Sequence, residues 1–160
     1  MMVNIDQQIY NISLWDTAGQ EEYSALRSLS YPLTDCFLLC YSITIPSSLE
    51  NIITKWIPEL KEHAPNIPII LAGLKCDVID DSHILEMLAQ RNIIPVSLQQ
   101  GEEIASTIGA KNHILASALT GKNVNHLFES CVRTANSNNN IKNPKKSPNL
   151  LSRIIAKFNK

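Results

Sequence analysis

The sequence predicts an α/β domain built on a mainly parallel sheet, and the apolar pattern of residues 36–74 carries most of that prediction. Residues 36–42 (CFLLCYS) and 68–74 (PIILAGL) are continuous apolar runs of strand length, as expected for strands that are covered on both faces. Residues 47–65 between them carry apolar side chains at helical spacing. A strand, a helix and a second strand in this order are typical of parallel pairing through a crossover helix.

The segments on either side continue the alternation. Residues 1–15 are expected to form a β-hairpin around a polar turn at residues 6–8. In the helix over 47–65, a serine at the start can cap the first turn, whereas Pro58 should kink or end the regular part. Further along, the patterns predict a helix, a second helix, a strand and a last helix, over residues 81–92, 99–109, 113–119 and 124–135. The domain is therefore expected to occupy residues 1–135.

Length and composition exclude several classes of protein. A chain of 160 residues fits one domain, and an apolar content of 44% with 18% charged residues excludes a wholly disordered or collagen-like chain. No apolar stretch is long enough for a membrane-spanning helix, and the N-terminus lacks the pattern of a signal peptide. The four cysteines form no CxxC pair, so neither a disulfide framework nor a cysteine metal site is expected. A reducing, cytoplasmic compartment is the default.

The charge is distributed unevenly. Residues 1–129 contain all 15 acidic residues, whereas residues 130–160 contain seven of the 14 lysines and arginines and no acid. Residues 136–149 are rich in Asn, Pro and Lys and are expected to form a linker. A basic tail on an acidic body indicates an anionic partner.

Residues 150–160 are predicted to form a basic amphipathic helix. At about 100° per residue, five apolar side chains fall within a stripe roughly 140° wide: Leu150, Leu151, Ile154, Ile155 and Phe158. One interpretation is that residues 145–160 bind an anionic membrane surface at the cytoplasmic face. The other is that the helix packs on the domain itself. Nucleic acid is not expected as a partner, because Phe158 is the only aromatic residue among the basic ones.

The run DTAGQEEY at residues 16–23 contains the candidate catalytic and metal-binding residues. It directly follows the predicted strand that ends at Trp15. An Asp16 carboxylate at a strand end can hold Mg²⁺ through its water shell. The Gly19 N–H can approach a γ-phosphate because no Cβ intervenes. Gln20 can orient an attacking water. The run therefore indicates a nucleotide-phosphate site.

This run and several motifs after it resemble the small GTPases of the Ras superfamily, and specifically the Rho/Rac family. The matching segments are residues 15–23 (third motif and second switch), 30–35 (its Rho-type continuation), 47–50 and 56–59 (the next helix, Pro58 included), 72–77 (guanine-specificity motif) and 117–120 (last base-binding loop). The helical segment after Asp81 resembles the insert that separates Rho proteins from Ras and Rab. The resemblance implies a P-loop-NTPase-like G domain, α/β, with helices on both sides of a mainly parallel sheet.

The resemblance also implies a role for each matching residue. Asp77 should accept two hydrogen bonds from guanine while the Lys75 stem packs on the purine, Gln20 should be the catalytic residue, and Asp16 should hold Mg²⁺ indirectly through water. The residues expected to contact GTP or GDP are Asp16, Thr17, Ala18, Gly19, Gln20, Leu74, Lys75, Cys76, Asp77, Ser117, Ala118 and Leu119. Leu74 departs from the family, which has Asn or Thr there.

The family places a strand, a phosphate loop (G-x-x-x-x-G-K-[ST]), a helix and an effector loop before the hairpin, and none of them is present in these 160 residues. The missing strand is central in the family's sheet, so two inner strand edges are expected to need a new partner. A chain without the phosphate loop is expected to be inactive alone. A truncated product or incomplete gene model is one explanation, and a genuine pseudo-GTPase is another.

Two functional hypotheses follow. The first is a Rho/Rac-like small GTPase that binds and hydrolyses GTP as a signalling switch on actin and membrane dynamics, impaired by the loss of the phosphate loop. The second is a non-catalytic interaction module tethered to membrane by its tail. Rho-type effectors and regulators are expected to bind residues 21–31 and the insert at 81–92. Because the chain ends in KFNK rather than a C-a-a-X box, prenylation is not expected.

Overall fold

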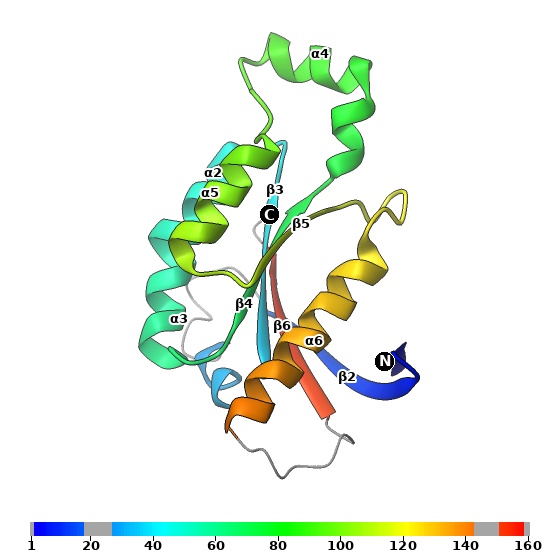
Figure 1. The fold of residues 1–160 in the computed structure, drawn as a ribbon. Helices are drawn as coiled ribbons and strands as arrows, with labels where there is room; N and C mark the ends of the chain where they lie inside the picture. The colour runs from blue at the N-terminus through cyan, green and yellow to red at the C-terminus, as the bar shows by residue number, and fades with distance from the viewer. Residues whose placement is uncertain (1, 18–26, 143–150, 159–160) are drawn as a thin grey trace.

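The computed structural model describes residues 2–17, 27–142 and 151–158, which form one six-stranded sheet with helices on both faces (Figure 1). The strands are β1 Met2–Ile5, β2 Gln8–Thr17, β3 Cys36–Ser42, β4 Ile69–Leu74, β5 Asn112–Ala116 and β6 Leu151–Phe158. Their order across the sheet is β1-β2-β6-β3-β4-β5. β1 runs antiparallel to β2, and every other pair is parallel. The predicted α/β fold with a mainly parallel sheet is confirmed.

The sheet divides the core into two clusters, one on each face. One face is covered by α2 Pro46–Asn51, η3 Ile52–Trp56, α3 Ile57–His63 and α5 Leu98–Ile108, and the other by α6 Val124–Lys142 (Figure 1). Alternate residues of β3 serve the two faces, with Cys36, Leu38 and Cys40 in the α6 cluster and Phe37, Leu39 and Tyr41 in the other. Both faces of β3 are therefore buried, which explains why its sequence is a continuous apolar run.

The predicted N-terminal hairpin is confirmed. Asp6 and Gln7 connect β1 to β2 with positive φ angles of 52° and 64°, which is the backbone of a two-residue hairpin turn that follows the twist of its strands. The Asp6 carboxylate accepts two hydrogen bonds from Arg133 of α6, one of them at 2.9 Å. The turn is thereby tied to the helix that covers the hairpin.

The helix predicted over residues 47–65 extends from Pro46 to His63, but residues 52–56 form a π-helical turn. Pro58 has no N–H, so a regular helix would leave the carbonyl of Thr54 without its donor. The wider turn places that irregularity just before the proline. The prediction that Pro58 disturbs the helix is confirmed.

The two following helices begin at capping side chains. The Asp81 carboxylate caps α4 Ser82–Gln90 by accepting the amide of Ile84 at 3.1 Å. Ser97 and Gln100 exchange hydrogen bonds at the start of α5, and Gly109 ends that helix with a φ of +73°. α4 has no fully buried residue and projects beyond the sheet (Figure 1).

The predicted linker begins too early. α6 continues to Lys142, so the first half of the segment 136–149 is helical rather than irregular. The Ser137 hydroxyl donates to the Arg133 carbonyl at 3.0 Å, and Asn138 and Pro68, the residue before β4, line the same hollow. The sequence alone favoured a break in this segment.

The predicted amphipathic helix over residues 150–160 is wrong. Residues 151–158 form β6, which pairs in parallel with β2 on one side and β3 on the other. Ile154, Ile155 and Ala156 are at most 1% exposed. Ile154 and Ala156 belong to the α6 cluster and Ile155 to the opposite one, so the strand is buried on both faces.

The position of β6 gives the physical reason. Without it, β2 and β3 would each leave a row of backbone groups unpaired inside the sheet, and each such group costs about 1–3 kcal/mol. A short apolar segment fits a strand or a helix equally well by its pattern. The backbone groups of β2 and β3 that would otherwise be unpaired therefore favour the strand over the helix.

No helix within the described part of the chain combines the length and the hydrophobicity that crossing a membrane would require.

Candidate nucleotide site

The carboxyl ends of β2, β6, β3, β4 and β5 meet at one edge of the sheet, because these strands are mutually parallel. Ligands of open α/β sheets bind outside this edge. The predicted site residues that the structure describes are all at this edge: Asp16 and Thr17 at the end of β2, residues 74–77 at the end of β4, and residues 117–119 after β5. Ala18, Gly19 and Gln20 lie outside the described residues.

Asp16 and Thr17, which are predicted to lie on the phosphate side, end β2. They pair in register with Ala156 and Lys157 of β6. The Asp16 side chain is exposed, while Thr17 is half-buried and its hydroxyl oxygen has no hydrogen-bond partner among the described residues. Mg²⁺ takes oxygen ligands and keeps several waters, so one exposed carboxylate fits the indirect role predicted for Asp16. The described residues contain no cluster of three metal-ligating side chains.

The segment after β4 forms one wall of the base side. Leu74 ends the strand, and Lys75 adopts a left-handed backbone with a φ of 63°. That conformation is strained for a residue with a Cβ and is commonly found at functional sites. It turns the chain into η4 Cys76–Asp80, where Cys76 is buried and Asp77 is half-buried in the first turn. The strained turn brings the polar side chain of Asp77 to the sheet edge.

The loop after β5 forms the opposite wall. The Ser117 hydroxyl accepts the amide of Thr120 at 3.2 Å, and the Ser117 amide donates to the Lys122 carbonyl at 3.0 Å. Ser117 is fully buried, whereas Ala118 is exposed and Leu119 is 86% exposed. Ser117 therefore holds the shape of the loop, and the residues after it face solvent.

An ion pair that the sequence reasoning missed joins the two walls. Lys122 Nζ lies 3.6 Å from Asp80 Oδ2. Both side chains are more than half exposed, so the pair contributes little to stability. Its value is geometric, because it links the end of η4 to the loop that follows β5. The only signal for this ion pair in the sequence is that Lys122 closely follows the predicted base-binding loop at residues 117–120.

A second group of residues anchors the chain just after residues 18–26. Arg27 donates two hydrogen bonds to Glu59 of α3, at 3.0 Å and 2.7 Å, and lies over the Trp56 ring at 5.0 Å. The Tyr31 hydroxyl also donates to Glu59. Burial, together with the Glu59 carboxylate, raises the pKa of Tyr31. No pattern in the sequence pointed to this network, because its members are far apart along the chain.

Tyr41 of β3 and His113 of β5 form a stacked pair of rings across β4, which lies between these two strands. Tyr41 Oη lies 2.9 Å from His113 Nε2, and the rings stack at 5.9 Å. A Cβ on Gly73 would come within 2.7 Å of the Tyr41 hydroxyl, and one on Gly101 within 2.3 Å of the His113 ring. Both glycines are therefore required by packing. Burial lowers the pKa of His113 and raises that of Tyr41 to about 12.

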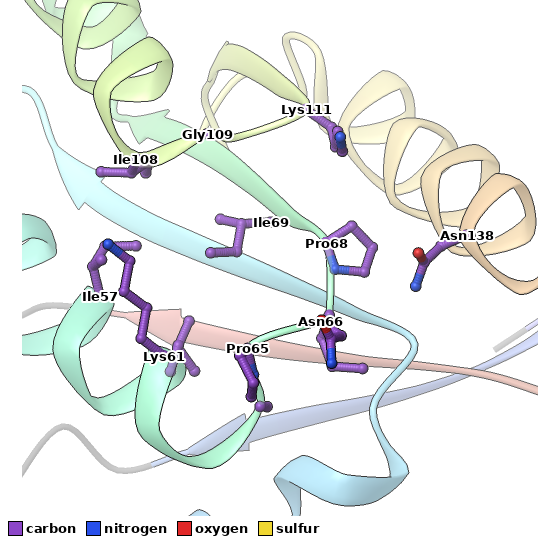
Figure 2. A pocket seen from close by; sticks show the side chains of 13 residues that line it. Ile57, Lys61, Pro65, Asn66, Pro68, Ile69, Ile108, Gly109, Lys111 and Asn138 are labelled. Atoms are coloured by element: carbon purple, nitrogen blue, oxygen red, sulfur yellow. The ribbon is translucent and has the colours of Figure 1, made fainter. Parts of the chain in front are cut away.

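A hollow of about 290 Å³ lies at the other end of β4, next to Pro68 and Ile69 (Figure 2). Its polar lining includes Lys61 of α3, Lys111, which precedes β5, and Asn138 of α6. Ile69 and Ile108 form part of its apolar lining. None of the residues predicted to contact nucleotide is among its lining residues. The hollow is thus separate from the candidate nucleotide site.

Comparison with known proteins agrees with this architecture. The family model described as "Ras family" matches residues 1–137. The chain is 43% identical over 133 residues to "GTP-binding protein RHO1" of Candida albicans, 45% identical to that of Eremothecium gossypii and 44% identical to that of Kluyveromyces lactis. Each match covers 83% of this chain and 67%, 64% and 64% of the respective relative. The chain thus spans about two thirds of the length of these relatives.

The extent of these matches shows that the chain belongs to the Ras family of small GTPases. Within that family it is a Rho-type small GTPase, since its identity to three Rho1 proteins is 43–45%. The predicted Rho/Rac resemblance is therefore confirmed.

Proposed function

We propose that this chain binds guanine nucleotide at the carboxyl edge of its sheet, through the two loops that follow β4 and β5. The observation that carries the proposal is that the two loops lie together at this edge, where the Lys122–Asp80 ion pair joins them at 3.6 Å. The half-buried Asp77 lies in the first turn of η4, two residues after the exposed Lys75. A carboxylate next to an amphipathic lysine stem is suited to the polar edge and the flat face of a purine.

Discrimination between purines would come from Asp77. Its two carboxylate oxygens accept hydrogen bonds, and guanine offers two adjacent donors where adenine does not. A buried acceptor that loses its donors costs about 1–3 kcal/mol, so adenine should bind at least several-fold more weakly. Ser117 supports this selectivity indirectly by holding the second loop in shape.

The phosphate side is expected to be weak. Asp16 would hold Mg²⁺ through water, and the bound ion would offset phosphate charge. The family's phosphate loop supplies backbone amides, a lysine and a metal-binding hydroxyl, and these 160 residues contain no G-x-x-x-x-G-K-[ST] sequence. We therefore propose that GTP hydrolysis through Gln20 is impaired when this chain acts alone.

The alternative is a non-catalytic pseudo-GTPase module, and one observation favours it. β6 already occupies the position next to β2 and β3 where the family's phosphate-loop strand is expected. Partner binding would then be independent of GTP. In either case we propose a cytoplasmic location, effectors or regulators at residues 21–31 and 81–92, and a role in signalling to actin. Binding of residues 145–160 to anionic membranes would require β6 to leave the sheet.

The test is a titration of residues 1–160 with a fluorescent guanine nucleotide in Mg²⁺. Asp77→Ala should abolish saturable binding, whereas Asp81→Ala, which removes a nearby carboxylate that only caps α4, should leave binding unchanged. An excess of unlabelled guanine nucleotide should displace the probe, and the adenine nucleotide should not. A folded protein that does not bind would refute the nucleotide proposal and favour the interaction module.

A further inference from the structure

Five segments of the chain surround the hollow of about 290 Å³ at the amino end of β4 (Figure 2). They are α3, residues 64–68, the start of β4, residues 108–111 at and after the end of α5, and Asn138 of α6. The lining is mostly apolar and includes four isoleucines and two prolines. A concave, mostly apolar hollow with few polar groups is the usual form of a small-molecule site.

Backbone hydrogen bonds and prolines fix the loop that forms one wall of the hollow. The Ile67 amide donates to the Ala64 carbonyl at 3.2 Å, and the Pro68 carbonyl accepts the Phe37 amide at 2.9 Å. Pro65 and Pro68 restrict the backbone between these bonds. A ligand therefore enters a hollow that is already formed, so little of the binding free energy is lost in ordering the loop.

Every charged residue in the lining is a lysine. Figure 2 shows Lys61 and Lys111 on opposite sides of the hollow. Neither lysine forms an ion pair with a carboxylate in the described part of the chain. Asn138 is half-buried and also belongs to the lining. The hollow therefore combines an apolar interior with two cations whose charge no acid of the lining neutralises.

Two helix ends beside the hollow reduce its positive charge. α3 ends at His63 and α5 at Ile108, and the C-terminus of a helix carries roughly −0.5 of an elementary charge. Two lysines and two such helix ends leave a net charge of about +1. That balance favours a ligand with a single negative charge. A phosphate group carries nearly two charges at neutral pH and is commonly bound by arginine, and the lining includes no arginine.

We propose that this hollow binds a small carboxylic acid with an apolar chain, such as a medium-chain fatty acid. The chain is buried against the isoleucines of the lining, and the carboxylate stays at the rim, where the ammonium groups of Lys61 and Lys111 attract it. The Asn138 amide is a further donor for the carboxylate. The proposed guanine site is at the other end of β4, so this inference does not rest on nucleotide binding.

The experiment is a titration of isotope-labelled residues 1–160 with octanoate, in the absence of nucleotide, followed by two-dimensional NMR. Octanoate should cause saturable shifts of the amides of residues 66–67 and 108–111. Hexanoate is two CH₂ groups shorter and should bind roughly 10–20-fold more weakly, because each buried CH₂ contributes about fourfold in affinity. Octylammonium, which has the same chain and the opposite charge, should not bind.

Matched variants test the two lysines. Lys61→Gln and Lys111→Gln each remove one exposed charge of the lining, and each should lower the affinity for octanoate about threefold. Arg91→Gln removes the same charge from an exposed residue at the end of α4, and it should leave the affinity unchanged. Thermal unfolding shows whether each variant is folded before it is titrated.

Three outcomes would overturn the proposal. One is the lack of a saturable shift at residues 66–67 and 108–111. Another is an unchanged affinity when Lys61→Gln and Lys111→Gln are combined, because the carboxylate would then make no contribution. The third is tighter binding of octyl phosphate than of octanoate at about pH 8, where the phosphate is doubly charged. Because no nucleotide is present, a failure of the guanine site would leave all of these results unaffected.

Discussion

Deleting residues 150–160 should remove most of the stability of the domain. The deletion takes away β6, whose residues Ile154 and Ile155 are at most 1% exposed. Full burial of each isoleucine stabilises the fold by about 1.5–3 kcal/mol, and the small Ala156 adds less. The expected loss is therefore about 4–7 kcal/mol, before any cost of the unpaired edges of β2 and β3.

That loss is large compared with the total, since a domain of this size is stable by only about 5–15 kcal/mol. Each kcal/mol shifts Tm by about 2–4 °C at this length, so the deletion should lower Tm by about 10–25 °C or abolish the cooperative transition. The exposed inner edges should also promote association between chains.

The assay is thermal unfolding followed by circular dichroism, together with light scattering for the oligomeric state. The matched control deletes only residues 159–160, which follow β6, and it should unfold like the full chain. Unchanged Tm and an unchanged monomer after removal of residues 150–160 would refute the placement of this segment in the sheet. That result would restore the earlier expectation of a separate tail helix.

Three other perturbations test the packing that supports the site. Glu59→Ala leaves Arg27 buried without its carboxylate partner. Chemical denaturation should therefore show that the free energy of unfolding falls by about 3–5 kcal/mol. A decrease below about 1 kcal/mol would contradict the buried network. Gly101→Ala forces a Cβ within 2.3 Å of the His113 ring and 2.5 Å of the Tyr41 hydroxyl. Calorimetry should show a destabilisation of about 1–3 kcal/mol, and adding the same change to a His113→Ala background should cost less, because only the contact with Tyr41 remains. Because burial lowers the pKa of His113 in the folded state, with Glu102 acting weakly in the opposite direction, protonation favours the unfolded chain. Stability should therefore be full above about pH 6.5 and fall as the pH drops below it, and a pH profile that His113→Gln does not flatten would disprove this assignment.

The sequence identified the regular elements wherever a local signal coincided with the tertiary contacts. The continuous apolar runs of β3 and β4 and the helical patterns over residues 81–92 and 99–109 each predict an element that the structure contains. The prediction of a disturbance at Pro58 also holds, because the missing N–H is a local property of the residue. The extension of α6 to Lys142 was not predicted, since asparagine favours a break by propensity.

The candidate site could be predicted only in part. Lys75, Asp77 and Ser117 were recognised because they stand in motifs that resemble those of the Rho family and follow the family's order. The left-handed backbone of Lys75 and the ion pair between Lys122 and Asp80 depend on how the loops fold, and they are visible only in three dimensions. The Arg27–Glu59 network also joins residues that are distant in sequence.

By itself, the sequence determined the α/β class of this protein, the order of its elements as far as residue 135, and its likeness to the Rho GTPases, because these depend on local periodicity and contiguous motifs. Only the tertiary structure determined that residues 151–158 form a strand rather than a helix. The apolar side chains of that segment satisfy the spacing of a helix as well as that of a strand, so its sequence does not distinguish the two. The unpaired backbone groups of β2 and β3 do distinguish them, because only a strand can satisfy both edges at once.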